Sequence, residues 1–370
     1  MGWTPLSRSA SLYSSTTDLH LFVDISSHGF GHLAITAPVL EALAASLPEL
    51  RLTVRSRLPP SQLQQRIAHP FELIADNTDF GFAMIDATQV DQTASALAYQ
   101  DAHAHWLDRV TAETGFLKQQ SPDFVLTNVS YLPLAGATLA GIHCASLCSL
   151  NWADLFQHFF GHETWAAAIH RQILDAYQSA DAFLRVTPGM AMSDFPHVRD
   201  IAPIAARGLR HSLPFGGDKA VLVAMGGIAH RLPVEAWPSI PGIRWLVSQN
   251  WRCTHPDAIA WETLGLSFTD LLASVDTVIT KPGYGTFTEA VCNGTPVLYQ
   301  RREDWPEQEC LITWLERHGQ CAEIEAEKLI CGDVEKALSE LWQQPCPEQP
   351  VMDGAAEAAA WIRAAGSRGS

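Results

Sequence analysis

Short apolar runs of strand length alternate with stretches of helical periodicity along the whole chain. In the first half these runs predict strands at 19–25, 51–55, 71–74, 123–127, 143–149 and 182–185, with helices that include 33–46 and 152–178. In the second half they predict strands at 220–225, 245–248, 276–280 and 296–299, and a terminal helix at 355–365. Strands that alternate with helices are typical of βαβ units, so an α/β fold with a parallel sheet in each half is expected.

The pattern is lost over the Pro- and Gly-containing stretch 188–214 and returns at Ala220, which predicts a linker between two domains. A chain of 370 residues also exceeds the roughly 250–300 residues that one hydrophobic core supports. The expected organisation is a disordered tail, an N-terminal domain, a C-terminal domain and a final helical segment able to pack back on the N-terminal domain, at 1–17, 18–205, 206–345 and 346–370.

Composition narrows the class of protein. With 47% hydrophobic and 17% charged residues the chain is globular, and a net charge of −16 disfavours binding to nucleic acid. The eight cysteines form no CxxC pair and no zinc-like cluster, so reduced thiols, a cytoplasmic location and no metal site are expected. Neither a signal peptide nor an apolar run of the ~18 residues that span a bilayer is found, so no transmembrane segment is expected.

The densest chemistry follows the predicted strand 276–280. A glycine turn and a helix starting near Gly285 or Thr286 would direct free backbone N–H groups and the positive end of the helix dipole at one point, which suits a diphosphate. Lys281 adds a positive charge, and Thr286 can cap the helix or bind a phosphate oxygen. Glu289, one turn on, can accept both hydroxyls of a ribose. The alternative is a tight βα turn with a capping threonine and a solvated glutamate.

A second group of polar residues follows the first predicted strand and reads Ser26-Ser-His-Gly-Phe-Gly-His32. Open α/β sheets bind ligands at the carboxyl ends of their strands, and a neutral imidazole is a plausible general base near pH 7. His28 and His32 are therefore candidate bases. Glycines let the backbone approach a ligand, so Gly29, Phe30 and Gly31 between the two histidines are expected to contact the molecule that loses the proton. The alternative is that each histidine is only a turn residue or a helix cap.

The same loop also fits the G-x-G-x-x-G/A dinucleotide fingerprint, through Gly29, Gly31 and Ala34. Arg55 and Arg57, after the second strand, would then hold a ribose 2′-phosphate. An NADP-binding oxidoreductase is thus an alternative function. It leaves the segment after strand 276–280 unexplained.

The segment from Gly283 to Pro296 resembles the nucleotide-binding segment of GT-B glycosyltransferases, in which a Gly, a Ser or Thr and a Glu at three-residue spacing precede a Gly-x-Pro turn. It is similar to that of the peptidoglycan N-acetylglucosaminyltransferase and, more closely, to the glycosyltransferase-like N-terminal region of L-arabinokinases. The resemblance implies a GT-B fold, with two Rossmann-like domains whose parallel sheets face a central cleft. It also implies a UDP- or dTDP-sugar as co-substrate, with no further cofactor, and an acceptor that the sequence does not identify.

The resemblance also implies roles for individual residues. His32 stands at the Gly-His position whose histidine removes the acceptor proton, with His28 as a further candidate. Where some inverting relatives orient that base with an acidic residue, this chain has Asn128, which leaves open how His32 is held. The resemblance implies that four segments contact the donor: a glycine pair, a segment near the nucleobase, the turn and helix that bind the diphosphate, and a loop that binds the sugar. In that order their residues are Gly226 and Gly227; Phe268; Lys281, Gly283, Tyr284, Gly285, Thr286 and Glu289; and Asp304, Glu307 and Gln308.

Within this donor set several alternatives stay open. Gln308 is the expected ligand of the donor sugar, while Asp304 and Glu307 compete for the acidic role, or all three belong to a charged surface loop. Phe268 either packs on the nucleobase or belongs to the core. The predicted activity is inverting, metal-independent sugar transfer, with a nucleotide-sugar epimerase or hydrolase and a non-catalytic sugar-nucleotide sensor as alternatives beside the oxidoreductase.

Overall fold

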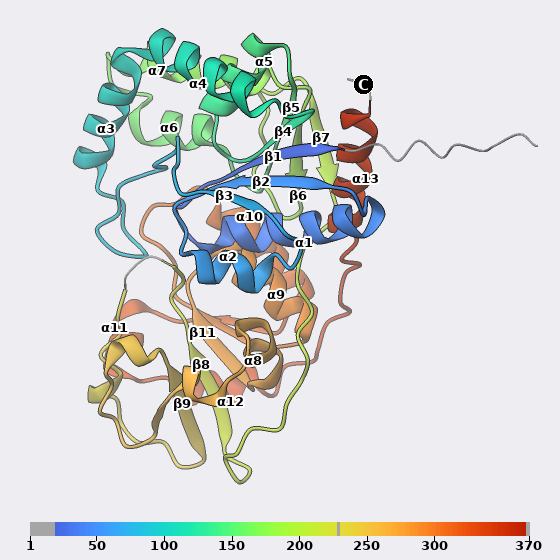
Figure 1. Ribbon diagram of the computed structural model, residues 1–370. Helices are drawn as coiled ribbons and strands as arrows, with labels where there is room; N and C mark the ends of the chain where they lie inside the picture. The colour runs from blue at the N-terminus through green and yellow to red at the C-terminus, as the bar shows by residue number, and fades with distance from the viewer. Residues whose placement is uncertain (1–18, 228–229, 368–370) are drawn as a thin grey trace, which may run out of the picture.

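Two parallel β-sheets of seven and six strands form the body of the chain (Figure 1). The computed structural model describes residues 19–227 and 230–367, so the predicted tail 1–17 lies outside the described residues. The strand orders are β3-β2-β1-β4-β5-β6-β7 and β10-β9-β8-β11-β12-β13. Each sheet starts at an inner strand, runs to one edge and returns on the other side, which creates a switch point at β1/β4 and another at β8/β11. Open sheets bind ligands at such points.

The first sheet contains β1 (His20–Ile25), β2 (Arg51–Arg55), β3 (Glu72–Ile74), β4 (Phe124–Asn128), β5 (His143–Cys148), β6 (Ala182–Val186) and β7 (Val198–Ile201). Its helices are α1 (Phe30–Ser46), α2 (Pro60–Arg66), α3 (Gln92–Ala104), α4 (Trp106–Gln120), α5 (Leu132–Ala140), α6 (Trp152–Phe160) and α7 (Ala166–Gln178). The inner strands β1 and β4 are buried along their whole length, as expected for a sheet with helices on both faces.

The second sheet contains β8 (Lys219–Val223), β9 (Ile243–Val247), β10 (Ala258–Ala260), β11 (Thr277–Thr280), β12 (Val297–Tyr299) and β13 (Cys321–Glu323). Its helices are α8 (Phe268–Ser274), α9 (Tyr284–Asn293), α10 (Gln308–His318), α11 (Ala326–Cys331) and α12 (Glu335–Leu341), with short 3-10 turns at Val234–Ala236, Gln249–Trp251 and Trp261–Leu264. Every strand pair in both sheets is parallel, which confirms the predicted α/β class.

Several local predictions from the sequence are wrong. Helix α1 begins at Phe30 rather than Leu33, so His32 lies in its first turn. The single helix predicted over 152–178 is two helices, α6 and α7, separated by a turn that starts at Gly161. The predicted linker 188–214 contains β7, whose short sequence Val-Arg-Asp-Ile exposes two polar residues at the sheet edge and carries little apolar signal.

The terminal helix α13 (Gly354–Gly366) returns to the first sheet, where it lies beside α1 and β7 (Figure 1). The backbone N–H of Ala202 donates to Glu357 at 2.8 Å, and Trp361 meets Phe124 edge-on at 6.1 Å. No helix among residues 19–227 and 230–367 is long and apolar enough to cross a membrane.

The two sheets are joined by close contact between α1 and α9. A Cβ atom on Gly285 would lie 2.8 Å from Cβ of Ala34, so glycine allows the two helices to approach. The hydroxyl of Tyr284, in the first turn of α9, accepts from the N–H of Ile204 at 2.9 Å and donates to the carbonyl of Thr187 at 3.0 Å. Tyr284, predicted as a donor contact, therefore ties α9 to the chain after β6 and β7.

Candidate functional site

The glycine turns after β8 and β11 meet around one ammonium group. A Cβ on Gly226 would lie 3.6 Å from Nζ of Lys281, and one on Gly283 would lie 3.8 Å from it. Gly226 has φ of +90°, which side chains other than glycine rarely adopt, and both Gly226 and Gly227 are exposed. The two turns thus leave the ammonium of Lys281 beside accessible backbone.

Helix α9 begins beside the ammonium group of Lys281. Its N-cap is Gly283, with no side-chain cap, so of the two predicted roles of Thr286 the capping one is wrong, and the bond to a phosphate oxygen stays a prediction. Thr286 is instead a half-buried residue of the first turn. Free N–H groups and the helix dipole therefore add positive potential next to Lys281.

Burial lowers the pKa of Lys281 from its usual range to about 7, and the nearby charge of Arg302 lowers it further against the opposing effect of Glu307. A lysine with a pKa lowered by burial and a like charge is one that a bound anion would return to the ammonium form. The chemistry of this turn suits a phosphate oxygen.

His32 lies in the first turn of α1, on the first sheet's side of the contact between α1 and α9. Its Nδ1 is 2.7 Å from Oδ1 of Asn128 at the end of β4, and an amide oxygen only accepts, so Nδ1 carries the proton and Nε2 the lone pair. Burial lowers the pKa of His32 to about 4, although the bond to Asn128 opposes this. Asn128, which stands where an acidic residue was expected, therefore holds the His32 ring in the tautomer that a general base requires.

His28 belongs to the same cluster but makes different contacts. Its Nε2 donates to the carbonyl of Phe82 at 3.1 Å, and its ring stacks on Trp305 at 5.7 Å. The centroids of His28 and His32 are 6.4 Å apart. Burial lowers the pKa of His28 to about 3, helped by the charges of His32, Arg302 and Lys281. Arg302 and Lys281 of the second sheet thus lie close enough to His28 for their charges to affect its pKa.

Glu289 is not solvated, so that alternative is wrong. Its side chain is 2% exposed and binds Arg66 of α2 through both oxygens, at 2.5 and 3.3 Å. Burial raises the pKa of Glu289, although the charge of Arg66 lowers it. Each carboxylate oxygen keeps a further lone pair, so the ion pair leaves acceptor capacity for a ribose hydroxyl.

The loop after β12 uses its predicted sugar ligands for other contacts. Gln308 bonds the backbone of Arg302 through both its amide atoms, at 3.0 and 3.2 Å. Glu307 accepts from the hydroxyl of Ser149 at 2.5 Å and from the indole N–H of Trp305 at 3.0 Å. Asp304 is exposed and lies 2.7 Å from His158. Each of the three thus already has partners inside the protein.

Sequence reasoning missed Arg302, whose guanidinium lies 3.8 Å from the centroid of Trp305 and is 6% exposed. Only its position, three residues after β12 in a loop predicted to bind a ligand, could have singled it out. Phe30 is 40% exposed and faces Gly227, on which a Cβ would lie 2.8 Å from the phenyl ring. Phe268 is the first residue of α8 and meets Trp261 edge-on at 6.3 Å.

Arg55 does not have the role that the NADP alternative requires. It is 3% exposed and binds Asp24 at 2.5 Å and Glu113 at 2.6 Å, so its charge is neutralised inside the first sheet. Arg57 is exposed and paired with Asp76. The fingerprint residues Gly31 and Ala34 pack against Gly285 of α9, on which a Cβ would lie 3.6 and 2.8 Å from them.

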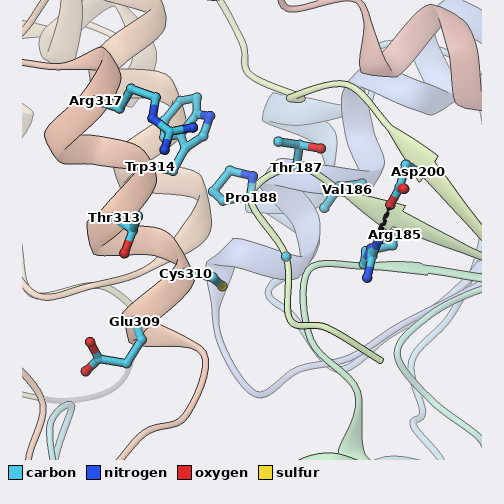
Figure 2. A pocket seen from close by; sticks show the side chains of 11 residues that line it. Arg185, Val186, Thr187, Pro188, Asp200, Glu309, Cys310, Thr313, Trp314 and Arg317 are labelled. Atoms are coloured by element: carbon cyan, nitrogen blue, oxygen red, sulfur yellow. Dashed lines mark hydrogen bonds and ion pairs between the residues drawn. The ribbon is translucent and has the colours of Figure 1, made fainter. Parts of the chain in front are cut away.

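A groove of about 610 Å³ lies outside this cluster, between the end of β6 and α10. Figure 2 shows Glu309, Thr313 and Arg317 on α10 opposite the chain at Thr187–Pro188. Arg185 at its far side is held by Asp200 at 2.6 Å. None of the predicted site residues lines this groove. Within the described part of the chain, no three His, Cys, Asp or Glu side chains gather closely enough to hold a metal ion.

Two parallel sheets with the same strand order, closed by a terminal helix that returns to the first, define the GT-B fold. Solved structures with this fold include the glycotransferase of kitacinnamycin, with a TM-score of 0.63 and 16% identity over 95% of both chains. The glycosyltransferase VinC in complex with dTDP gives a TM-score of 0.53 and 14% identity, covering 95% of this chain and 100% of that one. UGT2 of Phytolacca americana, complexed with UDP-2-fluoro-glucose and pterostilbene, gives 0.55 and 15% identity, covering 94% of both.

In sequence, the chain is 25% identical to L-arabinokinase of Arabidopsis thaliana over 360 residues, which is 89% of this chain. It spans only 33% of the length of that relative. No family model matches the chain.

Proposed function

We propose that this chain is a glycosyltransferase that binds a UDP- or dTDP-sugar between its two sheets and transfers the sugar to an acceptor hydroxyl. The observation that carries the proposal is that each sheet contributes one of the two groups that the reaction needs. One is Lys281 between two glycine turns at the start of α9, and the other is His32 with its lone pair free on Nε2. A cation cradle and a base are what a displacement at an anomeric carbon requires.

The reaction is a single displacement with inversion. Nε2 of His32 takes the proton of the acceptor hydroxyl, and the resulting oxygen forms a bond to the anomeric carbon. The bond from that carbon to the diphosphate oxygen breaks, and its electron pair leaves with the diphosphate. Lys281, the free N–H groups of α9 and the turn at Gly226-Gly227 stabilise the departing charge, so positive charge from the protein serves where other enzymes use a metal.

The nucleotide contacts follow from the same helix. Glu289 accepts the ribose hydroxyls beside Arg66, and Phe268 lies against the base. The complexes of VinC with dTDP and of the plant transferase with a UDP-sugar favour these two nucleotides here. The narrower likeness to the peptidoglycan N-acetylglucosaminyltransferase, carried by Gly283 to Pro296, favours UDP.

A thermal-shift comparison tests the nucleotide class. UDP or dTDP at 100 times its dissociation constant should stabilise the protein by about 2.7 kcal/mol through mass action, and NADPH should not. Lys281→Met is the matched variant that should lose the shift. Stabilisation by NADPH alone would overturn the proposal. Product analysis with a UDP-sugar then separates transfer from epimerisation, hydrolysis or mere binding.

A further inference from the structure

Arg302 is a buried cation whose backbone and guanidinium both make close contacts. Gln308 bonds its backbone N–H and carbonyl, and the guanidinium carbon lies over the ring of Trp305, 3.8 Å from the centroid. Trp305 is 2% exposed and its ring also stacks on His28. The loop after β12 therefore presents Arg302 at the same indole that contacts the histidine of the first sheet.

Two donor groups of this guanidinium have no hydrogen-bond partner. Within the described part of the chain, Nε and Nη2 of Arg302 are buried and donate to no acceptor. The charges of two acids, Glu307 and Asp86, act on Arg302, but both carboxylates are bonded elsewhere. Glu307 accepts from Ser149 and Trp305. Asp86 accepts the N–H and hydroxyl of Thr88 and lies 3.6 Å from His230. Buried charges in proteins are normally paired, so a buried guanidinium with unpartnered donors indicates a binding site for an anionic ligand.

The neighbours of Arg302 indicate where such an anion would bind. Trp305 contacts both the guanidinium of Arg302 and the ring of His28, and the charge of Arg302 lowers the pKa of both Lys281 and His28. The guanidinium is therefore close to the glycine turns around Lys281 and to the histidines. The polar side chains of the loop that were expected to hold sugar hydroxyls are bonded within the protein. Among the described residues of this loop, Oε1 of Gln300 and two donors of Arg302 are buried without a hydrogen-bond partner. The guanidinium is the cation of these two, and it suits a phosphate or carboxylate bound through two oxygens.

We propose that Arg302 binds an anionic oxygen group of the nucleotide sugar, beside Lys281. This inference rests on the proposed function and extends it, because the group is either a phosphate of the diphosphate or a carboxylate on the sugar itself. In the second case the donor is a nucleotide-linked uronic acid.

Titration calorimetry on Arg302→Gln tests the proposal, with UDP, UDP-glucose, UDP-glucuronate and inorganic pyrophosphate as probes. Arg301→Gln is the matched control, because Arg301 is in the same loop but is paired with Glu309 and Glu323. We expect Arg302→Gln to weaken binding by about tenfold or more, the scale of one charge-assisted hydrogen bond, and Arg301→Gln to stay within about twofold of wild type.

The probes distinguish the sources of the anion. Weaker binding of all four by Arg302→Gln assigns the contact to a phosphate, and weaker binding of UDP-glucuronate alone assigns it to a carboxylate. Unchanged affinity for every probe overturns the inference. If wild type binds pyrophosphate through Arg302 but binds no nucleotide, the proposed function fails and the anion site stands.

A melting curve of each free protein guards against a structural explanation. Removing an unpaired buried charge should leave the melting temperature equal or higher. A large fall in Arg302→Gln, shared by Arg302→Lys, would mean that the guanidinium supports the fold, and would overturn the proposal. Arg302→Lys should fold like wild type and retain part of the affinity, because it keeps the charge without the planar fork.

Discussion

The ion pair between Arg66 and Glu289 joins α2 of the first sheet to α9 of the second, and its two ends differ in burial. Glu289 is 2% exposed, whereas the side chain of Arg66 is 23% exposed. Breaking a buried pair by removing one partner costs about 3–5 kcal/mol when the other is left without water. Arg66→Met strands a carboxylate in the interior, so we expect a loss of about 3 kcal/mol in the free energy of unfolding. Glu289→Gln strands an arginine that can turn to water, so about 1–2 kcal/mol is expected.

Urea denaturation at pH 7, followed by tryptophan fluorescence, measures both losses. The double variant should cost less than the sum of the single ones, since it leaves no orphaned charge. Losses below about 0.5 kcal/mol for both variants would place the pair among weak surface contacts and refute the reasoning. A larger loss for Glu289→Gln than for Arg66→Met would refute the assignment of the buried end.

The pH dependence has a definite sign. Burial raises the pKa of Glu289 above its usual value even with Arg66 present, so the folded state keeps a proton that the unfolded state releases. Stability therefore falls as pH rises from the ordinary value of 4.5 through the folded pKa. In Arg66→Met this fall should be steeper, so the deficit against wild type should be smaller at pH 5 than at pH 8.

The same two variants separate a ribose contact from a purely structural role. Both break the ion pair, but only Arg66→Met retains the carboxylate. Glu289→Ala or Glu289→Gln should weaken UDP or dTDP binding by at least about tenfold, because two charge-assisted hydrogen bonds are lost. Equal nucleotide affinity in all variants would remove Glu289 from the donor site.

Two further predictions concern the cation and the base. Because the pKa of Lys281 is lowered to about 7, its ammonium loses its proton above that pH, and pyrophosphate affinity should fall as pH rises through 7. Between pH 7 and 10.5 only the unfolded state keeps this proton, so the stability of the free protein should rise with pH over that range. Lys281→Met should lose both trends, the first in calorimetry and the second in melting curves. His32→Ala should slow sugar transfer by about 10²–10⁴-fold with little change in nucleotide affinity, and an unchanged rate would exclude His32 as the base. Asn128→Asp should raise the pKa of His32 from about 4, measured by NMR titration, and no change would mean that residue 128 does not face Nδ1.

The sequence alone determined the architecture and indicated candidate positions for the chemistry. Buried strands such as β1 and β4 read as continuous apolar runs because helices cover both faces of a parallel sheet, so their positions could be predicted to within a residue or two. Edge strands such as β7 could not, because three or four residues with polar exposure carry no periodic signal. The glycine turns were also predictable, since a turn after a buried strand needs residues such as Gly226 at positive φ.

Only the tertiary structure decided which polar side chains remain available. Glu289 and Arg66 are 223 positions apart, and no local pattern indicates that they form an ion pair. Spacing assigned Gln308 to a sugar, whereas in the fold its amide bonds the backbone of Arg302 and leaves that guanidinium unpaired. Contacts between segments distant in sequence decide which polar side chains already have hydrogen-bond partners. Motif spacing therefore indicated the loop after β12 as a candidate ligand site, while the packing of the two sheets decided that Arg302 in this loop has buried donors without a partner.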